Sequence, residues 1–376
     1  MKILYIRNKE DGYFKSFISS DIIIENNIYL LDLKNREFTD YNSGKVIHLL
    51  GKSKFYNRKI INYISRFIAA LAFLIKFKHY SFDICHILNI KRENFWIIRF
   101  LKKRTKKIII TVYGRSTYLF RIKRFLFKFV YNNCDVFTFQ NLNTLEEFHQ
   151  FNPKLDTQKL VELLLPIEQI DYVYNLSNDD KSALYEKLNL KKDLIHISCS
   201  STISAYDQHF KVINELSKIK NKEKVQLMFL LTYGGKKEYK QQVIEKIKND
   251  LSDFEVRIFE SYLASKDIAS YRMCTDIYIN MRTTDNIAGA ILETLKAGSF
   301  LLSASWLKYN VLDKLGVYYK KVNTFSELAP EIDYHIEKFQ ELKSRYSQTN
   351  SSIIEQNCSH KAIISQWVDL YQKLNR

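Results

Sequence analysis

Two carboxylates in the second half of the chain have a spacing that suits a shared ligand. Asp285 and Glu293 are separated by seven residues, and Gly289 lies in the short loop between them. Apolar residues at helical spacing continue to Gly298, which is a plausible C-terminal stop. One carboxylate on a loop and another two turns along the next helix can contact two parts of one ligand. The loop can also present free helix N-terminal N–H groups to an anion.

This D-x7-E pattern resembles the E-x7-E motif of retaining GT-B glycosyltransferases of family 4, with Asp in the first position. The resemblance implies that Asp285 and the N–H groups after it hold the donor sugar, and that Glu293 binds the ribose hydroxyls of the nucleotide. Those N–H groups belong to Asn286, Ile287, Ala288 and Gly289. Replacing Glu293 by Ala is then expected to abolish donor binding and leave the fold intact.

Alternating strand and helix patterns position these residues. In the first half the strands are expected at 2–6, 28–33, 46–50, 84–88, 107–112, 136–139 and 160–165. A second series restarts at 194–199 and continues through 225–231, 256–259 and 277–280. Two such runs predict an α/β protein with two doubly wound, Rossmann-like domains and parallel sheets. The GT-B resemblance implies that the two domains face each other across a cleft, and such sheets bind ligands at the carboxyl ends of their strands.

The polar stretch after Pro166 suggests the domain boundary. We expect an acceptor-binding, membrane-facing domain over 1–175 and a nucleotide-sugar donor domain over 176–350. The remaining residues, 351–376, are expected to form a helix that packs back on the first domain. The sequence L-P-I-E-Q-I-D at 165–171 resembles the interdomain P-N-G-V-D stretch of the family without its Gly.

The donor diphosphate needs a cation, and the residues that usually supply it are replaced here. The family has Arg and Lys-Gly after the first strand of the donor domain, whereas this chain has S-C-S-S-T-I-S-A-Y-D-Q-H-F-K. His209 and Lys211, at the start of the next helix, are the expected substitutes, although His209 could instead be structural. Tyr233 and Gly234 lie in a T-Y-G-G-K-K-E-Y run similar to a turn in bacterial transferases that add an amino-deoxy sugar to lipid-linked acceptors. A plain tight turn is the alternative for that run.

The acceptor side is expected in the first domain. The segment I-T-V-Y-G-R-S-T at 110–117 occupies the place of the family's H-G-S-D-like loop, with Tyr and Thr in place of His and Asp. Gly114 and Arg115 in this segment, together with Gly12, are the candidate acceptor-side residues. The D-x7-E pattern favours retention of anomeric configuration. If the enzyme inverts instead, Asp11 is the best candidate base.

Positive charge is concentrated in one quarter of the chain. The net charge is +17, and residues 41–134 contain 21 Lys or Arg against two acids, Asp83 and Glu93. The bases alternate with large apolar residues, which favours an anionic membrane surface as partner. A solvated helix face and a nucleic-acid site are the alternatives. With the resemblance, this predicts a peripheral protein on the cytoplasmic face of a bacterial membrane, acting on a lipid-linked saccharide for surface polysaccharide such as O-antigen or capsule.

Several other classes of protein are disfavoured by missing motifs. No D-x-D pair is present, so we expect no metal and no cofactor beyond the nucleotide-sugar co-substrate. P-loop, zincin and α/β-hydrolase motifs are also missing. The five scattered cysteines are expected to be buried thiols in a reducing compartment. A nucleotide-sugar epimerase of the same fold and a non-catalytic basic membrane- or nucleic-acid-binding protein remain as alternatives.

Overall fold

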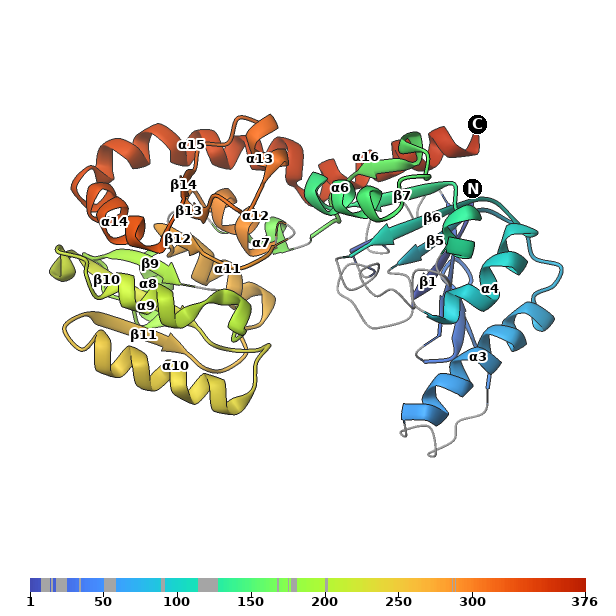
Figure 1. Cartoon of the computed structure of the whole chain (residues 1–376), viewed down its shortest axis with the longest axis horizontal. Coiled ribbons are helices and arrows are strands. Elements are labelled where there is room, and N and C mark those ends of the chain that lie inside the picture. Colours follow the sequence, from blue (N-terminus) through green and yellow to red (C-terminus); the bar gives the residue numbers. More distant parts are fainter. Residues whose placement is uncertain are drawn as a thin grey trace. The chain divides into compact units, whose positions relative to one another are not determined.

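The computed structural model describes most of the chain. The described residues are 1–7, 14, 16–17, 26–33, 35–50, 59–88, 92–113, 128–167, 169–174, 176, 181–199, 202–285, 287 and 289–376, without the side chains of 59–63, 92–96 and 174. They form two compact units, Met1–Pro166 with Lys361–Arg376, and Ile167–His360. Figure 1 labels their helices and strands. Each unit is an α/β fold built on a mainly parallel sheet, which confirms the fold class predicted from the sequence.

The sheet of the first unit has the strand order β4-β3-β2-β1-β5-β6-β7-β8. The strands are β1 (Lys2–Arg7), β2 (Asn27–Asp32), β3 (Glu37–Asp40), β4 (Lys45–His48), β5 (Phe82–Leu88), β6 (Thr105–Val112), β7 (Val136–Phe139) and β8 (Leu160–Glu162). The helices are α3 (Lys59–Lys76), α4 (Arg92–Lys102), α6 (Leu142–Phe151) and α16 (His360–Asn375), with a 3-10 turn η3 (Thr157–Lys159). From β2 to β8 the pairs are parallel, and the central strands are buried on both faces, as parallel strands are.

The antiparallel edge of this sheet was not predicted. Strands β3 and β4 pair antiparallel with their neighbours. A turn containing Gly44 at φ +66° joins them. Strand β3 carries a single fully buried side chain, Phe38, so its apolar pattern is too weak to recognise as a strand.

A buried hydrogen-bond network joins α16 to the first sheet. Tyr371 OH lies 2.8 Å from His86 Nδ1 and 3.1 Å from Tyr5 OH, and His86 Nε2 lies 2.6 Å from Thr111 Oγ1. Trp367 stacks on His86 and donates its indole N–H to a backbone carbonyl. Burial lowers the pKa of His86 to about 3, so this imidazole is neutral at pH 7. The C-terminal helix is therefore part of the first unit.

The second unit contains a fully parallel sheet of order β11-β10-β9-β12-β13-β14. Its strands are β9 (Ile195–Cys199), β10 (Val225–Leu230), β11 (Glu255–Phe259), β12 (Ile277–Asn280), β13 (Phe300–Ala304) and β14 (Lys320–Val322). Its helices are α7 (Gln169–Tyr174), α8 (Lys181–Leu188), α9 (His209–Leu216), α10 (Lys237–Asp250), α11 (Ser265–Met273), α12 (Gly289–Lys296), α13 (Asn310–Lys314), α14 (Leu328–Glu337) and α15 (Phe339–Cys358). Short 3-10 turns are η5 (Ala205–Asp207), η6 (Lys222–Lys224) and η7 (Phe325–Glu327).

The strand order places a topological switch point between β9 and β12. From β9 the chain proceeds outward to β10 and β11, and from β12 it proceeds the other way to β13 and β14. With right-handed crossovers, the helices of the two halves cover opposite faces and leave a crevice at the carboxyl ends of β9 and β12. Ligands of doubly wound sheets bind in this crevice. The D-x7-E stretch follows β12 directly, so the fold brings it to this position.

The end of α12 agrees with the stop signal in the sequence. Gly298 has φ +83°, and the N–H groups of Gly298 and Ser299 bond to the carbonyls of Leu295 and Thr294. A side chain at position 298 would also collide with Ser347 of α15. Glycine therefore both ends α12 and lets α15 approach it.

The boundary between the units lies at Pro166/Ile167, whereas the sequence suggested 175/176. Helix α7 explains the difference, because it packs on α11 and α12 of the second unit. At the other end, the second unit continues through α15 to His360, beyond the expected limit at residue 350.

Candidate functional site

The loop after β12 carries the first carboxylate of the motif. Asp285 Oδ2 accepts hydrogen bonds from Tyr309 OH at 2.7 Å and from Asn280 Nδ2 at 3.3 Å. Asn280 also donates to Tyr309 OH at 2.8 Å. Burial, followed by the adjacent carboxylate, raises the pKa of Tyr309 well above its usual value, so Tyr309 stays a hydrogen-bond donor. The carboxylate is thus oriented by two neutral side chains, Asn280 at the end of β12 and Tyr309 directly before α13.

The second carboxylate, Glu293 on α12, lies in a buried ion pair. Glu293 is 6% exposed, and its Oε2 accepts a hydrogen bond from Arg272 Nε of α11 at 3.2 Å. The guanidinium lies 5.4 and 5.5 Å from the ring centroids of Tyr271 and Tyr278. Burial acts to lower the pKa of Arg272, but Glu293 and the two phenols outweigh it and the pKa is raised. Arg272 therefore stays charged, and the pair joins α11 to α12.

The pair with Arg272 uses only one of the two oxygens of Glu293. Among the described residues Oε1 accepts no hydrogen bond. A Cβ at Gly289 would come within 3.1 Å of this oxygen, so glycine at the start of α12 leaves the space beside it open. Between the two carboxylates, Ile287 has φ +56°, a conformation that is strained for a β-branched residue. Strain of this kind is frequent at binding loops.

The cation nearest to Asp285 in the sequence is Arg282, which the motif analysis did not identify. Its Nε lies 3.7 Å from Asp207 Oδ1, beyond hydrogen-bond distance, and neither atom has a hydrogen-bond partner among the described residues. Burial acts to lower the pKa of Arg282, but Asp207 and Asp285 raise it overall. Burial raises the pKa of Asp207, against the effect of Arg282 and of a 2.5 Å hydrogen bond from Thr202. A positive group with unused hydrogen-bonding capacity therefore lies at the switch point.

Three hydrogen bonds hold the backbone of residues 281–283, which carries Arg282. Gln208 Nε2 donates to Met281 O at 2.6 Å, Trp306 Nε1 donates to Arg282 O at 2.7 Å, and Thr283 N donates to Tyr206 O at 2.9 Å. The partners come from the loops after β9 and β13. A small hollow beside this segment is lined by Asp207, His209, Asn280, Met281 and Arg282 together with four further residues of the strands and of α9. The hydrogen bonds join the loops after β9, β12 and β13 into one platform at the carboxyl edge.

The structure gives His209 and Lys211 surroundings that do not favour a diphosphate. His209 is buried, its Nδ1 lies 3.2 Å from Tyr239 OH, and burial lowers its pKa to about 4. A neutral imidazole supplies no positive charge at pH 7. The Lys211 ammonium lies 5.1 Å from the ring centroid of Phe325 and 3.2 Å from Gln208 Oε1. Both residues lie near the expected place, and their role in diphosphate binding stays a prediction.

The loop after β10 approaches the loop after β9 closely. Ile203 N donates to Tyr233 O at 2.7 Å, and Gly234 has φ +101°. A Cβ at Gly235 would lie 1.8 Å from Ile203 O, so only glycine fits. Tyr233 is 53% exposed. Burial of the Tyr233 phenol raises its pKa. The charges of Arg272, Glu293, Arg282 and Asp207 also act on this phenol, so both Arg–carboxylate pairs lie in its surroundings.

Exposed aromatic rings follow four strands of this sheet. They are Tyr206 after β9, Tyr233 after β10, Tyr262 after β11 and Trp306 after β13. Flat apolar faces at a ligand crevice can stack on a base or a sugar ring. The sequence signal that could have identified them is an aromatic residue shortly after each strand end.

Six of the sequence-predicted site residues lie outside the described residues. They are Asp11, Gly12, Gly114, Arg115, Asn286 and Ala288. The others are brought to the carboxyl edge of the second sheet: Asp285, Ile287, Gly289, Glu293, His209, Lys211, Tyr233 and Gly234. The predicted roles of both groups remain predictions.

In the described part of the chain, no group of three or more His, Cys, Asp or Glu side chains is arranged to hold a metal ion. The same residues include no helix with the length and hydropathy needed to cross a bilayer. All five cysteines are free and buried, as expected from their scattered positions. Independence of metal and location in the cell remain predictions.

Comparison with known proteins identifies the fold. No protein-family model matches the chain, and no curated protein sequence matches it significantly. Solved structures do match over nearly the whole chain. A glycosyltransferase from Rickettsia africae is 14% identical with a TM-score of 0.71, covering 99% of this chain and 98% of that one. Anabaena HepE in complex with UDP and glucose is 14% identical with a TM-score of 0.72, covering 99% and 100%.

Sucrose-phosphate synthase from Thermosynechococcus elongatus gives the same result. It is 12% identical with a TM-score of 0.74, and the match covers 100% of this chain and 99% of that chain. The chain therefore has the GT-B fold of these glycosyltransferases, as the D-x7-E resemblance implied.

Proposed function

We propose that the protein is a glycosyltransferase that uses a nucleotide-sugar donor. The observation that carries the proposal is the gathering of Asp285, Arg282 and the Glu293–Arg272 pair at the switch point of the second sheet, in a chain with the GT-B fold. HepE, which shares that fold, was solved with UDP and with UDP-glucose. A nucleotide sugar is therefore the donor class that we propose.

The proposed donor pose follows from the charges. Arg282 binds the diphosphate, because it is the cation beside Asp285 that has hydrogen-bonding capacity to spare. Glu293 Oε1 accepts from the ribose hydroxyls, and Asp285 faces the sugar. As the bond from the sugar to the diphosphate breaks, negative charge grows on the leaving oxygen. A fixed guanidinium stabilises that charge without a metal ion.

The group transferred is proposed to be a hexosyl or amino-deoxyhexosyl unit, and the acceptor a lipid-linked or oligosaccharide intermediate of bacterial surface polysaccharide. The D-x7-E pattern supports retention of configuration. The excess of Lys and Arg over 41–134 supports a peripheral location on the cytoplasmic face of the membrane. The family-like motifs in the first half support acceptor binding there.

A transfer assay tests the function. Purified protein is incubated with UDP-, GDP-, CMP- and dTDP-sugars labelled in the sugar, with and without a bacterial lipid extract. The proposal expects label to enter the lipid fraction with one nucleotide class. Turnover of the donor without any acceptor would indicate the epimerase alternative. Salt-sensitive binding to nucleic acid, with neither binding nor turnover of any donor, would indicate a non-catalytic protein.

The Arg282 assignment has its own test. Arg282→Gln is compared with Arg345→Gln, a change at an exposed arginine of α15 whose guanidinium lies over Tyr318. A lost charge-assisted hydrogen bond weakens binding of the nucleoside diphosphate by about 10- to 150-fold. Binding of the nucleoside without phosphate should change little in either variant. Equal diphosphate affinity in Arg282→Gln and the wild type would contradict the assignment.

A further inference from the structure

Helix α3 of the first unit carries two apolar faces, and only one of them packs in the core. Ala69, Ala70, Phe73, Leu74 and Phe77 are buried against the sheet. The opposite face holds Ile64, Ile68, Leu71 and Ile75, which are 51%, 45%, 36% and 72% exposed. Their spacing of four, three and four residues places them on one side of the helix.

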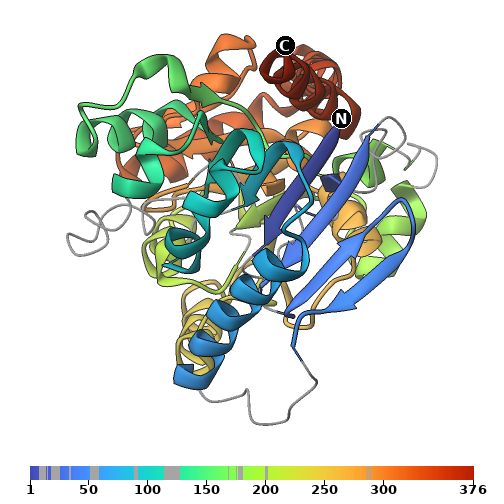
Figure 2. The same ribbon diagram turned by 90° about the vertical axis from the view of Figure 1, so that its right-hand side faces the viewer.

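This outer face, named here the α3 stripe (Ile64, Ile68, Leu71 and Ile75), is about 16 Å long at 1.5 Å per residue. Figure 2 shows α3 in blue, lying beside the strands at the edge of the first unit's sheet. Single exposed apolar residues are common, but four in register on one helix form a continuous patch.

Further apolar and basic side chains lie at the C-terminal ends of α3 and α4. Helix α4 packs beside α3 and exposes Phe100, with Tyr80 exposed in the turn that follows α3. Arg104 connects the two helix ends, because its Nη1 donates to Phe100 O at 3.2 Å and its Nε to Lys78 O at 3.4 Å. The two helix C-termini therefore form one edge rather than two separate ends.

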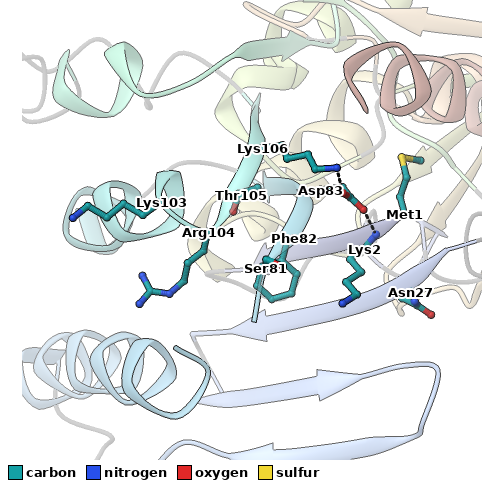
Figure 3. A pocket seen from close by; sticks show the side chains of 10 residues that line it. All are labelled: Met1, Lys2, Asn27, Ser81, Phe82, Asp83, Lys103, Arg104, Thr105 and Lys106. Atoms are coloured by element: carbon teal, nitrogen blue, oxygen red, sulfur yellow. Dashed lines mark hydrogen bonds and ion pairs between the residues drawn. The ribbon is translucent and has the colours of Figure 1, made fainter. Parts of the chain in front are cut away.

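A basic hollow lies at this edge. It has a volume of about 630 Å³ and is lined by Lys2, Lys103, Arg104 and Lys106, with Asp83 as the single acid (Figure 3). Asp83 is already engaged, because it pairs with Lys106 at 2.7 Å and accepts from Lys2 N at 2.8 Å. Within the described residues no carboxylate lies at ion-pair distance from the ammonium groups of Lys2 or Lys103. The hollow therefore has a net positive charge that the described residues do not neutralise.

We propose that the α3 stripe and the basic hollow together dock the protein on an anionic phospholipid bilayer, with the stripe inserted at the acyl boundary and a lipid phosphate in the hollow. Apolar side chains flanked by Lys and Arg are the chemistry of an interfacial helix. The near absence of acids over 41–134 supports an anionic occupant rather than a second copy of this basic face, since two copies would repel each other. This inference names the membrane surface that the proposed glycosyltransferase would bind. It rests on the proposed function only for the purpose of that binding.

The test measures vesicle binding without any nucleotide. Flotation with phosphatidylcholine vesicles is compared with flotation with vesicles that also contain phosphatidylglycerol. The wild type should bind the anionic vesicles, and Ile68→Glu/Ile75→Glu should bind them about tenfold or more weakly. The matched control is Tyr334→Glu, which changes an exposed apolar residue of α14 in the second unit and should bind as the wild type does.

Changes in the basic hollow should affect vesicle binding differently from changes in the α3 stripe. Lys2→Gln/Lys103→Gln should weaken binding to anionic vesicles at low salt and reduce its dependence on salt concentration. Wild-type-like vesicle binding by the Ile68→Glu/Ile75→Glu variant would overturn the proposal. So would binding of single-stranded nucleic acid but of neither vesicle, or a dimer that this variant dissociates. Binding of nucleotide sugars is measured separately on the same variant, so that a failure of the docking proposal can be distinguished from a failure of the donor proposal.

Discussion

Replacing Glu293 by Ala should strongly destabilise the second unit as well as remove a proposed ligand to the donor. The change leaves the Arg272 guanidinium, 3% exposed, without its carboxylate partner. Breaking a buried ion pair by removing one partner costs about 3–5 kcal/mol. For a domain of 150–250 residues, about 2–4 °C is lost per kcal/mol, so the unfolding midpoint should fall by roughly 6–20 °C.

A double-mutant cycle with thermal unfolding measures this coupling. Arg272→Met in the Glu293→Leu background removes both charges, and it should be less destabilising than the sum of the two single changes by roughly 0.5–3 kcal/mol. The control is Glu245→Ala, at an exposed position of α10, which should change the stability by no more than about 0.5 kcal/mol. A Glu293→Ala protein that unfolds within about 2 °C of the wild type would refute the buried-charge argument. The expectation of an intact fold in that variant, drawn from the sequence, did not include this pair.

Three further predictions concern catalysis, pH and metal. Asp285→Asn should lower the transfer rate about 100-fold or more with little change in the unfolding midpoint, since Asn keeps the size and can still accept from Tyr309; steady-state kinetics and thermal unfolding check this. His86 has a folded pKa of about 3, below its usual 6.5, so its contribution to stability is complete above pH 6.5 and is lost as the pH falls, by about 1.4 kcal/mol per unit. Denaturant unfolding of His86→Gln should show a flatter pH dependence between pH 6.5 and 4 than the wild type. Chelation with EDTA should leave donor binding and transfer unchanged, and restoration by Mg²⁺ or Mn²⁺ of an activity lost in EDTA would contradict metal independence.

The local pattern of the sequence predicted much of the second unit. The D-x7-E spacing and Gly298 placed α12 and its end, because helix periodicity and a left-handed glycine are short-range signals. The alternation of strand and helix predicted a parallel sheet, and the second unit has one. Strand β3 was missed because only Phe38 of its side chains is fully buried.

Interactions between distant residues could not be read from the same pattern. Arg272 and Glu293 are 21 residues apart on different helices, and their pairing depends on how α11 and α12 pack. His209 was expected either to meet the diphosphate or to be structural, and the sequence does not show that burial lowers its pKa to about 4. Arg282 could have been noticed as a cation three residues before Asp285. Its importance becomes clear only when Asp207 and the platform of the neighbouring loops are seen beside it.

The most direct test of the donor site is a thermal-shift measurement on the full chain with UDP-, GDP-, CMP- and dTDP-sugars in the absence of metal. A ligand that binds only the folded state raises the midpoint in step with RT ln(1 + [L]/Kd). The account predicts a rise with one nucleotide class that is retained in Arg345→Gln and reduced or lost in Arg282→Gln. If the folded wild-type protein shows no rise in its unfolding midpoint with any of the four donors, the result contradicts the account.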